Sequence, residues 1–179
     1  PILDVFDEVG VKFGLEVHPT EIAFDISSAQ RAIDALDGRD TFGFNYDPSH
    51  LAYQGVDCVA FILRFESRIY HVHMKDTRID RRNLRLQGLF DPTKHDQPEK
   101  RAWMWALVGW GHDESFWREF ITTLQFVGYE GALSIEMESD YMKVKEGVEM
   151  AAAFLKPLLL DAPPAPGTRW WEYAGFHGL

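Results

Sequence analysis

Four side chains able to bind a metal each stand near the end of a short apolar segment: Glu16, Asp47, His73 and Glu136. Three carboxylates and one imidazole brought to one place would repel one another unless a cation lay between them. Oxygen donors with one nitrogen form a fairly hard ligand set, which suits a divalent metal. The pattern therefore predicts a metal site, with Mn²⁺ favoured and Mg²⁺, Co²⁺ or Zn²⁺ as alternatives.

The four apolar segments have the alternation of β-strands. They span residues 11–17, 41–47, 69–75 and 132–137. Successive side chains of a strand point to opposite faces, and here one face is apolar while the other is small or polar toward the carboxyl end. Every predicted metal ligand falls on the polar face. His71 and His73 share this face but differ in depth: His73 lies at the level of the other ligands, and His71 lies two residues deeper.

Helical patterns separate these segments. One helix covers residues 1–9 and ends at Gly10, and another begins at Ser27 or Ser28 and runs to about Leu36. A third covers about 56–66, a fourth begins after the N-cap Asp113, and the last begins at Asp140. On the last helix the predicted buried side comprises Val144, Val148, Ala151, Ala152 and Leu155.

Alternating strands and helices predict an α/β fold with a parallel sheet and helical crossovers. An open doubly wound sheet is covered on both faces and would be apolar on both. A (β/α)8 TIM barrel instead turns its apolar face to the helices and builds a site from inward residues at the carboxyl ends of its strands. The one-sided polarity favours the barrel. No Gly-x-Gly-x-x-Gly follows any predicted strand, which weakens a dinucleotide-binding fold.

Residues around the four predicted ligands are candidates for substrate binding and for orienting the ligands. His18 and His50 lie just beyond ligand positions, where they would contact substrate hydroxyls or a second metal. Asp76 and Arg78 begin a long charged stretch in which they would pair or hold substrate. Others would hold the ligands in place from behind or beside them. We assign substrate binding to His18, His50, Lys75, Asp76 and Arg78, and supporting contacts to Asn45, His71 and Glu138.

Composition limits the partners and the compartment. The net charge of −10 disfavours a nucleic-acid partner. No apolar run is long enough to span a membrane. The one cysteine, Cys58, cannot form a disulfide within the chain, so we expect a reducing, cytoplasmic setting. Residues 76–112 form a long loop or lid, and residues 157–179 form a tail rich in proline and aromatic residues.

Several motifs together resemble the sugar phosphate isomerase/epimerase superfamily of xylose isomerase-like TIM barrels. They are Leu15-Glu16-Val17-His18-Pro19, Asp47-Pro48-Ser49-His50-Leu51, His71-Val72-His73-Met74-Lys75-Asp76, Gly109-Trp110-Gly111 and Gly128 to Glu136. The resemblance implies a metal held by the same four residues that strand alternation selects. It also implies that residues 1–156 are the C-terminal half of a TIM-barrel domain, supplying strands five to eight.

Four strands cannot close a barrel. We therefore expect the remaining half of the barrel to come from a longer polypeptide or from a second chain, since this sequence opens inside a helix without a starting Met. A homo-oligomer is also expected.

The resemblance implies a metal-dependent isomerase or epimerase of a sugar or polyol-like ketone. Glu16 and Glu136 would be the catalytic pair, removing and returning a proton through an enediolate. Lys75 and Asp76 depart from the pattern of ketose 3-epimerases and are more similar to inosose dehydratase or hydroxypyruvate isomerase relatives. Three alternatives remain: a dehydratase-like lyase, a zinc-dependent apurinic endonuclease and a non-catalytic half-barrel that binds metal or sugar.

Overall fold

A computed structural model of the chain describes residues 1–161. Its centre is a sheet of four parallel strands in the order β1-β2-β3-β6. The strands are β1 (Phe13–Glu16), β2 (Phe42–Tyr46), β3 (Ile69–Met74) and β6 (Leu133–Ile135). Sequence order and spatial order agree along this sheet, which is the arrangement expected of consecutive strands in a (β/α)8 barrel. The predicted α/β class and parallel sheet are confirmed.

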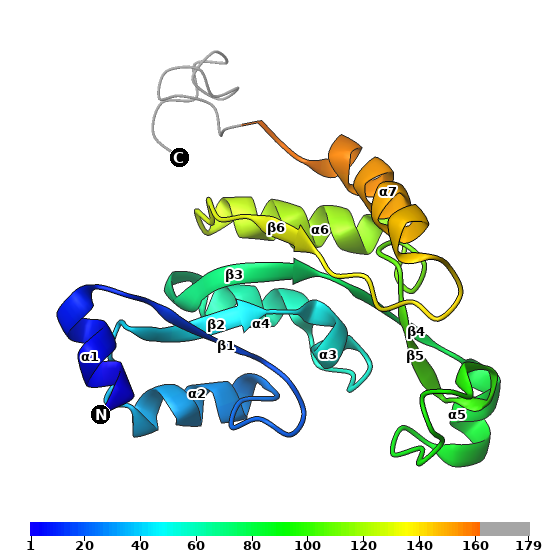
Figure 1. Cartoon of the computed structure of the whole chain (residues 1–179), viewed down its shortest axis with the longest axis horizontal. Coiled ribbons are helices and arrows are strands. Elements are labelled where there is room, and N and C mark those ends of the chain that lie inside the picture. Colours follow the sequence, from blue (N-terminus) through cyan, green and yellow to red (C-terminus); the bar gives the residue numbers. More distant parts are fainter. Residues whose placement is uncertain (162–179) are drawn as a thin grey trace, which may run out of the picture.

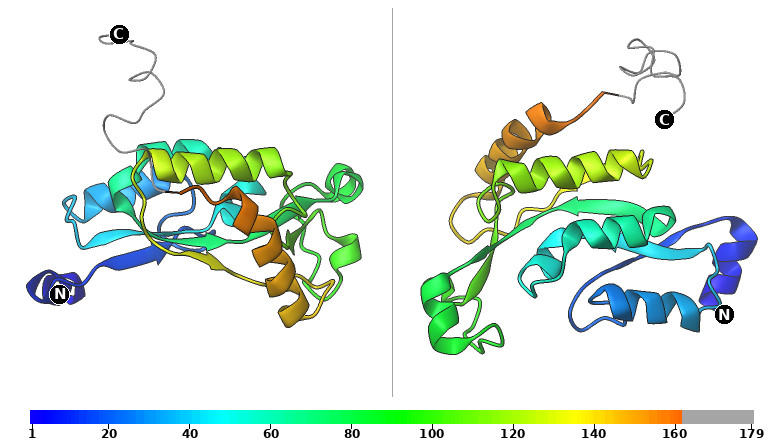
Figure 2. Two further views of the ribbon diagram at one scale, coloured as in Figure 1. Left: turned by 90° about the horizontal axis from the view of Figure 1, so that it is seen from above. Right: turned by 180° about the vertical axis from the view of Figure 1, so that it is seen from behind.

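Helices cover one face of this sheet. They are α2 (Ile26–Ala35), α4 (Cys58–Arg64) and α6 (Glu114–Phe126), which lie behind the strands in Figure 1 and in front of them in the reverse view of Figure 2. Further helices are α1 (Ile2–Val9), α3 (Pro48–Ala52), η1 (Glu66–Arg68) and η3 (Lys156–Leu158), and α7 (Val144–Leu155) follows β6.

Strand β2 shows why the predicted apolar face turns toward the helices. The ring of Phe44 meets those of Phe61 and Phe65 of the α4 region, with centroid distances of 5.4 and 5.3 Å. Tyr46 stacks on Phe61 at 4.4 Å and lies beside Phe120 of α6. These rings are almost fully buried. Burial of such aromatic area is the main term that fixes the helices on the sheet, and it leaves the opposite face of β2 to Asn45 and the adjoining Asp47.

Two helix starts differ from the prediction. Asp25, not Ser27 or Ser28, is the N-cap of α2; its carboxylate accepts from the Ser28 amide, and Ser28 completes a capping box. Helix α7 begins at Val144 rather than at Asp140, and Lys143 precedes it. Val144 and Val148 are exposed, contrary to the prediction. The Gly10 stop of α1, with φ of 70°, and the Asp113 cap of α6 are confirmed.

The stretch predicted as a long loop has regular structure. Strands β4 (Asp76–Ile79) and β5 (Trp103–Ala106) pair antiparallel, and α5 (Arg81–Gln87) and η2 (Pro98–Lys100) lie between them. Together residues 76–106 form an arm that projects from the carboxyl end of the parallel sheet (Figure 1). The loop prediction was wrong because both strands are only four residues long, too short for a clear alternation.

The two edge strands of the parallel sheet, β1 and β6, each pair with one strand among residues 1–161. Val11 and Phe13 beside the β1 edge are partly exposed, at 47% and 38%. Among the described helices, none is both long and apolar enough to cross a membrane. The aromatic residues of the predicted tail, from Trp170 onward, lie outside the described residues.

Candidate metal centre

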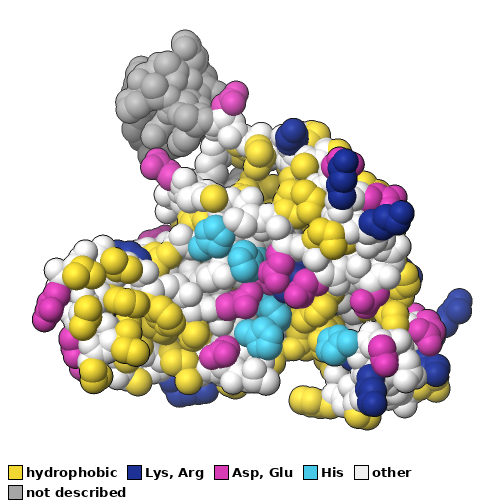
Figure 3. Space-filling model, in the orientation of Figure 1, with side chains coloured by type: hydrophobic (Ala, Val, Ile, Leu, Met, Phe, Trp, Pro, Cys, Tyr) yellow, Lys and Arg dark blue, Asp and Glu magenta, His cyan; other side chains and the backbone are white. Residues whose placement is uncertain are grey.

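The carboxyl ends of the four parallel strands bring the four predicted ligands together. Glu16 ends β1, His73 is the fifth residue of β3, and Asp47 and Glu136 directly follow β2 and β6. One ligand atom from each lies within 4.8 Å of the others. In Figure 3, histidine and acidic side chains gather in the middle of the face that the helices leave open. His71 is not in this group, which agrees with its predicted position two residues deeper on the strand.

His73 lies between the two glutamates. Its Nδ1 is 2.7 Å from Glu136 Oε2 and 3.2 Å from Glu16 Oε1. The close contacts with Glu136 and then with Glu16 raise the pKa of His73 to about 10. The contact with His73 in turn lowers the pKa of Glu136 to about 2, and it also lowers the pKa of Glu16. In the absence of a metal, a proton on His73 therefore supplies positive charge between these carboxylates.

Asn45 contacts the opposite nitrogen of the same imidazole. Its amide nitrogen is 3.3 Å from His73 Nε2, and its Oδ1 is buried with no hydrogen-bond partner. A rotation of the amide by half a turn would place Oδ1 against an Nε2–H group. That tautomer leaves the Nδ1 lone pair directed at the carboxylates, as a metal ligand requires.

Asp47 is the most deeply buried of the four, with no exposed side-chain surface. Its Oδ1 accepts from the Ser49 amide at the start of α3. Its Oδ2 lies 3.0 Å from Lys75 Nζ and 3.3 Å from His50 Nε2, yet accepts no hydrogen bond of ordinary geometry. Burial raises the pKa of Asp47 to about 6. The structure thus buries a carboxylate oxygen that a cation would satisfy.

Lys75 is a buried cation within the cluster and is only 2% exposed. Its ammonium group lies 3.0 Å from each of Asp47, Glu136 and Glu138. Burial opposes its charge, but the ion pairs with Asp47 and Glu136 outweigh that effect and raise its pKa. Lys75 therefore stays protonated and balances part of the negative charge that Glu138 adds beside the four ligands.

His18 and His50 stand together at the rim, with ring centroids 4.2 Å apart. Burial lowers the pKa of His50 to about 3, so that His50 is neutral near pH 7. Both rings line a cavity of about 390 Å³ that also reaches Glu16, Lys75 and Glu136. This volume is within the range of small-molecule sites.

Asp76 and Arg78 do not join this site. The Asp76 carboxylate is 1% exposed and accepts from the amides of Gly109, Gly111 and His112. It also accepts from Trp117 Nε1 and lies 2.7 Å from His112 Nδ1. The assignment of Asp76 to substrate binding was wrong, because its oxygens anchor the turn at the base of the arm. Arg78 is exposed, and among residues 1–161 no ion pair joins it to Asp76.

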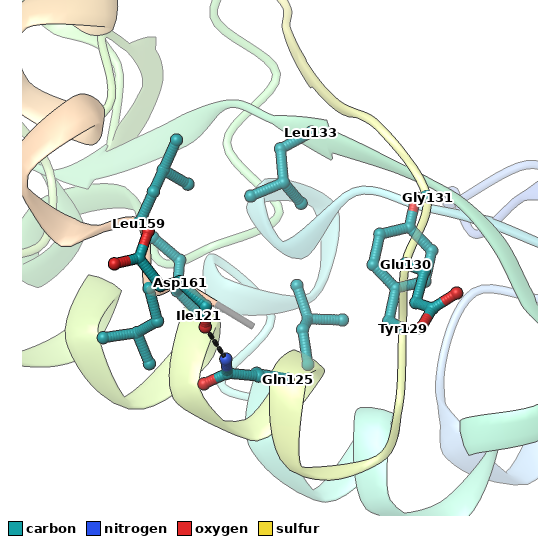
Figure 4. Close-up of a pocket in the computed structure, with 10 residues that line it drawn as sticks. Ile121, Gln125, Tyr129, Glu130, Gly131, Leu133, Leu159 and Asp161 are labelled. Atoms are coloured by element: carbon teal, nitrogen blue, oxygen red, sulfur yellow. Dashed lines mark hydrogen bonds between the residues drawn. The ribbon is translucent and has the colours of Figure 1, made fainter. Parts of the chain in front are cut away.

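Aromatic residues of the cavity wall were missed by the sequence reasoning. Trp103, Trp105 and His95 of the arm and Tyr53 at the end of α3 line the cavity beside the predicted ligands. The available signal was the Trp-Met-Trp alternation at 103–105, which places two indoles on one face of a strand. A separate cavity of about 260 Å³ between α6 and β6, lined by Ile121, Leu133 and Leu159, holds none of the predicted ligands (Figure 4).

The residues present fit a divalent metal. The set offers three carboxylates and one imidazole at close range. Two of its buried oxygens, Asp47 Oδ2 and Glu136 Oε2, have ionic contacts but accept no hydrogen bond. Glu16, Asp47 and Glu136 would contribute oxygen and His73 would contribute Nδ1, a donor set suited to a fairly hard cation.

A parallel sheet with helices on one face and an acidic cluster at its carboxyl ends is the architecture of part of a (β/α)8 barrel. A family model described as a xylose isomerase-like TIM barrel matches residues 1–158. The chain therefore belongs to the xylose isomerase-like TIM barrel family.

The chain is similar to a Bacillus subtilis protein and to a solved crystal structure. The uncharacterized protein YfiH of Bacillus subtilis (strain 168) is 34% identical over 145 residues, which are 81% of this chain and 46% of YfiH. The crystal structure of a xylose isomerase domain protein from Planctomyces limnophilus matches with a TM-score of 0.60 and 21% identity, over 85% of this chain and 46% of that one. The chain thus spans about half the length of the relatives it matches, and its sheet corresponds to about half of such a barrel.

Proposed function

We propose that this chain carries the metal and proton-transfer site of an isomerase or epimerase that acts on a sugar or polyol-like ketone. The observation that carries the proposal is the placement of Glu16 and Glu136. They come from the two edge strands of the sheet, β1 and β6, and both reach His73 at its centre. Two carboxylates on opposite sides of one site suit removal of a proton at one position and its return at another.

The divalent metal, for which Mn²⁺ is our choice, would supply positive charge beside the substrate carbonyl and so make the neighbouring carbon more acidic. The chain's own residues divide the remaining work. One glutamate removes the proton, and either this proton or one that the other glutamate has taken up from water is returned to the substrate. The pKa values of Glu16 and Glu136 are lowered by His73, so both are ionised near pH 7 and either can act as the base.

His50 and Lys75 would orient the substrate and the glutamate. His50 is neutral near pH 7, so its ring can donate one hydrogen bond to a substrate oxygen or accept one. Lys75 contacts Glu136 Oε1 at 3.0 Å, while Oε2 of the same carboxylate faces His73 at 2.7 Å. This division fixes the plane of the carboxylate and directs one oxygen to the metal position.

The remaining strands of the barrel would complete the site. The chain matches 46% of each relative, and each edge strand has one partner among residues 1–161. We propose that the missing strands come from a further part of the polypeptide or from a second chain, and that they contribute the other wall of the substrate pocket.

Glu136→Gln in the full-length protein tests the proposed function. Gln keeps the size of the side chain and removes the basic oxygen, so we expect exchange of substrate protons with deuterated water to fall by about 10²- to 10⁴-fold. The matched control is Glu130→Gln, on the turn before β6, which should leave exchange unchanged. Exchange in E136Q at the rate of the unmodified protein would remove Glu136 from the mechanism.

A further inference from the structure

The arm contributes an aromatic wall that the proposed proton transfer does not use. Trp103 and Trp105 of β5 line the same cavity as Glu16 and Glu136, together with Tyr53 and His95. The arm is built on β3 through the direct continuation from Met74 into β4. The turn at its base is anchored by the buried Asp76 carboxylate. The wall is therefore held in a fixed position relative to the metal cluster.

Within this wall, Trp103 and Trp105 have different surroundings. Tyr53 stacks on Trp103 with centroids 4.0 Å apart and planes within 5°, and the Arg101 guanidinium lies over the same ring at 4.5 Å. The Trp103 ring is therefore covered by protein groups, and it supports the neighbouring Trp105. Trp105 meets His50 edge-on at 4.8 Å, and Lys75 Nζ lies 4.8 Å from its ring centroid. The Trp105 ring therefore faces the cluster and remains half-buried at the cavity wall.

The charges that line the cavity exclude an anionic group from the part of the substrate that lies beside the arm. Glu16, Glu136 and Glu138 line it. Lys75 is the one Lys or Arg in its described lining, and its ammonium group already contacts Asp47, Glu136 and Glu138. A phosphate placed here would meet carboxylates without a cation to pair with. An indole ring instead offers a flat apolar surface to carbon-bound hydrogens.

We infer that Trp105 is a specificity-determining residue, and that the part of the substrate resting on the arm is an uncharged polyhydroxylated carbon skeleton rather than a phosphate ester. This inference rests on the proposed function. Hydroxyl groups of the substrate face His18 and His50, and its carbon face lies against the indole of Trp105.

Kinetics of the full-length, Mn²⁺-loaded protein test the inference with a panel of free sugars and cyclitol ketones and their phosphate esters. We expect the highest kcat/KM for an uncharged member. Trp105→Ala should raise KM for that member about tenfold, with kcat changed less than threefold, and Trp105→Phe should be intermediate. The control is Trp110→Ala, because Trp110 is close to Trp105 in the sequence but is 53% exposed and outside the cavity lining. It should keep the original KM.

Two results would overturn the inference while the proposed function stands: the highest kcat/KM for a phosphate ester, or equal KM values for W105A and W110A. If no panel member reacts, the proposed function fails separately, and calorimetric binding of the same compounds decides the inference. Tighter binding of uncharged compounds that weakens in W105A supports it. Tighter binding of phosphate esters, or binding of no compound, overturns it. Calorimetry with Mn²⁺ alone should give the same affinity in W105A and W110A.

Discussion

The metal cluster and the base of the arm each bury an aspartate, and the two carboxylates have opposite surroundings. Asp76 is 1% exposed and accepts from backbone amides of Thr77, Gly109, Gly111 and His112 as well as from side chains. Asp47 is equally buried but accepts from one amide and otherwise faces Lys75 and His50. A buried carboxylate that is fully hydrogen-bonded stabilises the fold. One with a buried oxygen that accepts no hydrogen bond, as with Asp47 Oδ2, is a candidate for metal binding and catalysis.

Substitution of the two aspartates gives the largest contrast. Asp47→Asn should abolish measurable Mn²⁺ binding and turnover but lower the free energy of unfolding only slightly. Asp76→Asn replaces an acceptor oxygen by an NH₂ group that faces backbone N–H donors, so we expect a loss of about 3 kcal/mol of stability. Denaturant unfolding and Mn²⁺ calorimetry on both variants check this. If D47N were destabilised and D76N were as stable as the unmodified protein, the roles given to the two aspartates would be reversed.

Metal affinity should depend on pH, because His73 is protonated in the metal-free site. Its pKa of about 10 requires that one proton leaves when Nδ1 binds a metal. The Mn²⁺ association constant should therefore rise about tenfold per pH unit between pH 6.5 and 8. Below about pH 6 the slope should steepen, because Asp47 then also carries a proton. Calorimetry in buffers of different ionisation enthalpy counts the released protons, and a count of zero would show that His73 is neutral.

The raised pKa of His73 also makes the stability of the metal-free protein depend on pH. The folded-state pKa of His73 is raised from 6.5 to about 10. The contribution of His73 to the free energy of unfolding is therefore complete below about pH 6.5 and is lost as the pH rises through about 10. Unfolding of the His73→Ala variant should lack this decline.

A smaller effect is expected at Asn45, which touches His73 without reaching the metal position. Asn45→Leu keeps the side-chain size and removes the partner of Nε2, so Mn²⁺ affinity should fall about tenfold. Asn83→Leu, on the arm, is the matched control and should leave Mn²⁺ affinity unchanged. If the two variants bind Mn²⁺ equally well, Asn45 has no role in orienting the imidazole.

The sequence predicts the metal cluster well because, in parallel strands, the alternation of side chains determines which residues share a face. The side-chain period of two places Glu16, Asp47, His73 and Glu136 on the face away from the aromatic core, and the parallel register brings their ends to one edge. The role of Asp76 could not be read in this way. Its partners at Gly109, Gly111 and His112 lie more than 30 residues away, and a sequence pattern does not reveal which distant amides will converge on a carboxylate.

The arm was missed for a related reason. Its two strands are short, and they pair across a long intervening segment with its own helix α5. The cavity wall formed by Trp105 depends on that pairing, and therefore on tertiary contacts that local propensity does not determine. The predicted start of α2 was wrong for a more local reason. Asp25 and Ser28 both have side chains that can cap a helix, and the reciprocal capping box makes Asp25 the N-cap.

Diffraction from crystals of the full-length protein soaked in Mn²⁺, collected at a wavelength where manganese scatters anomalously, tests the central claim most directly. We predict one anomalous peak in contact with carboxylate oxygens of Glu16, Asp47 and Glu136 and with Nδ1 of His73, and no such peak in H73A. A peak bound elsewhere on the protein, or a cluster that stays free of manganese while Lys75 and protonated His73 keep their contacts, would contradict the assignment of these four residues as a metal centre.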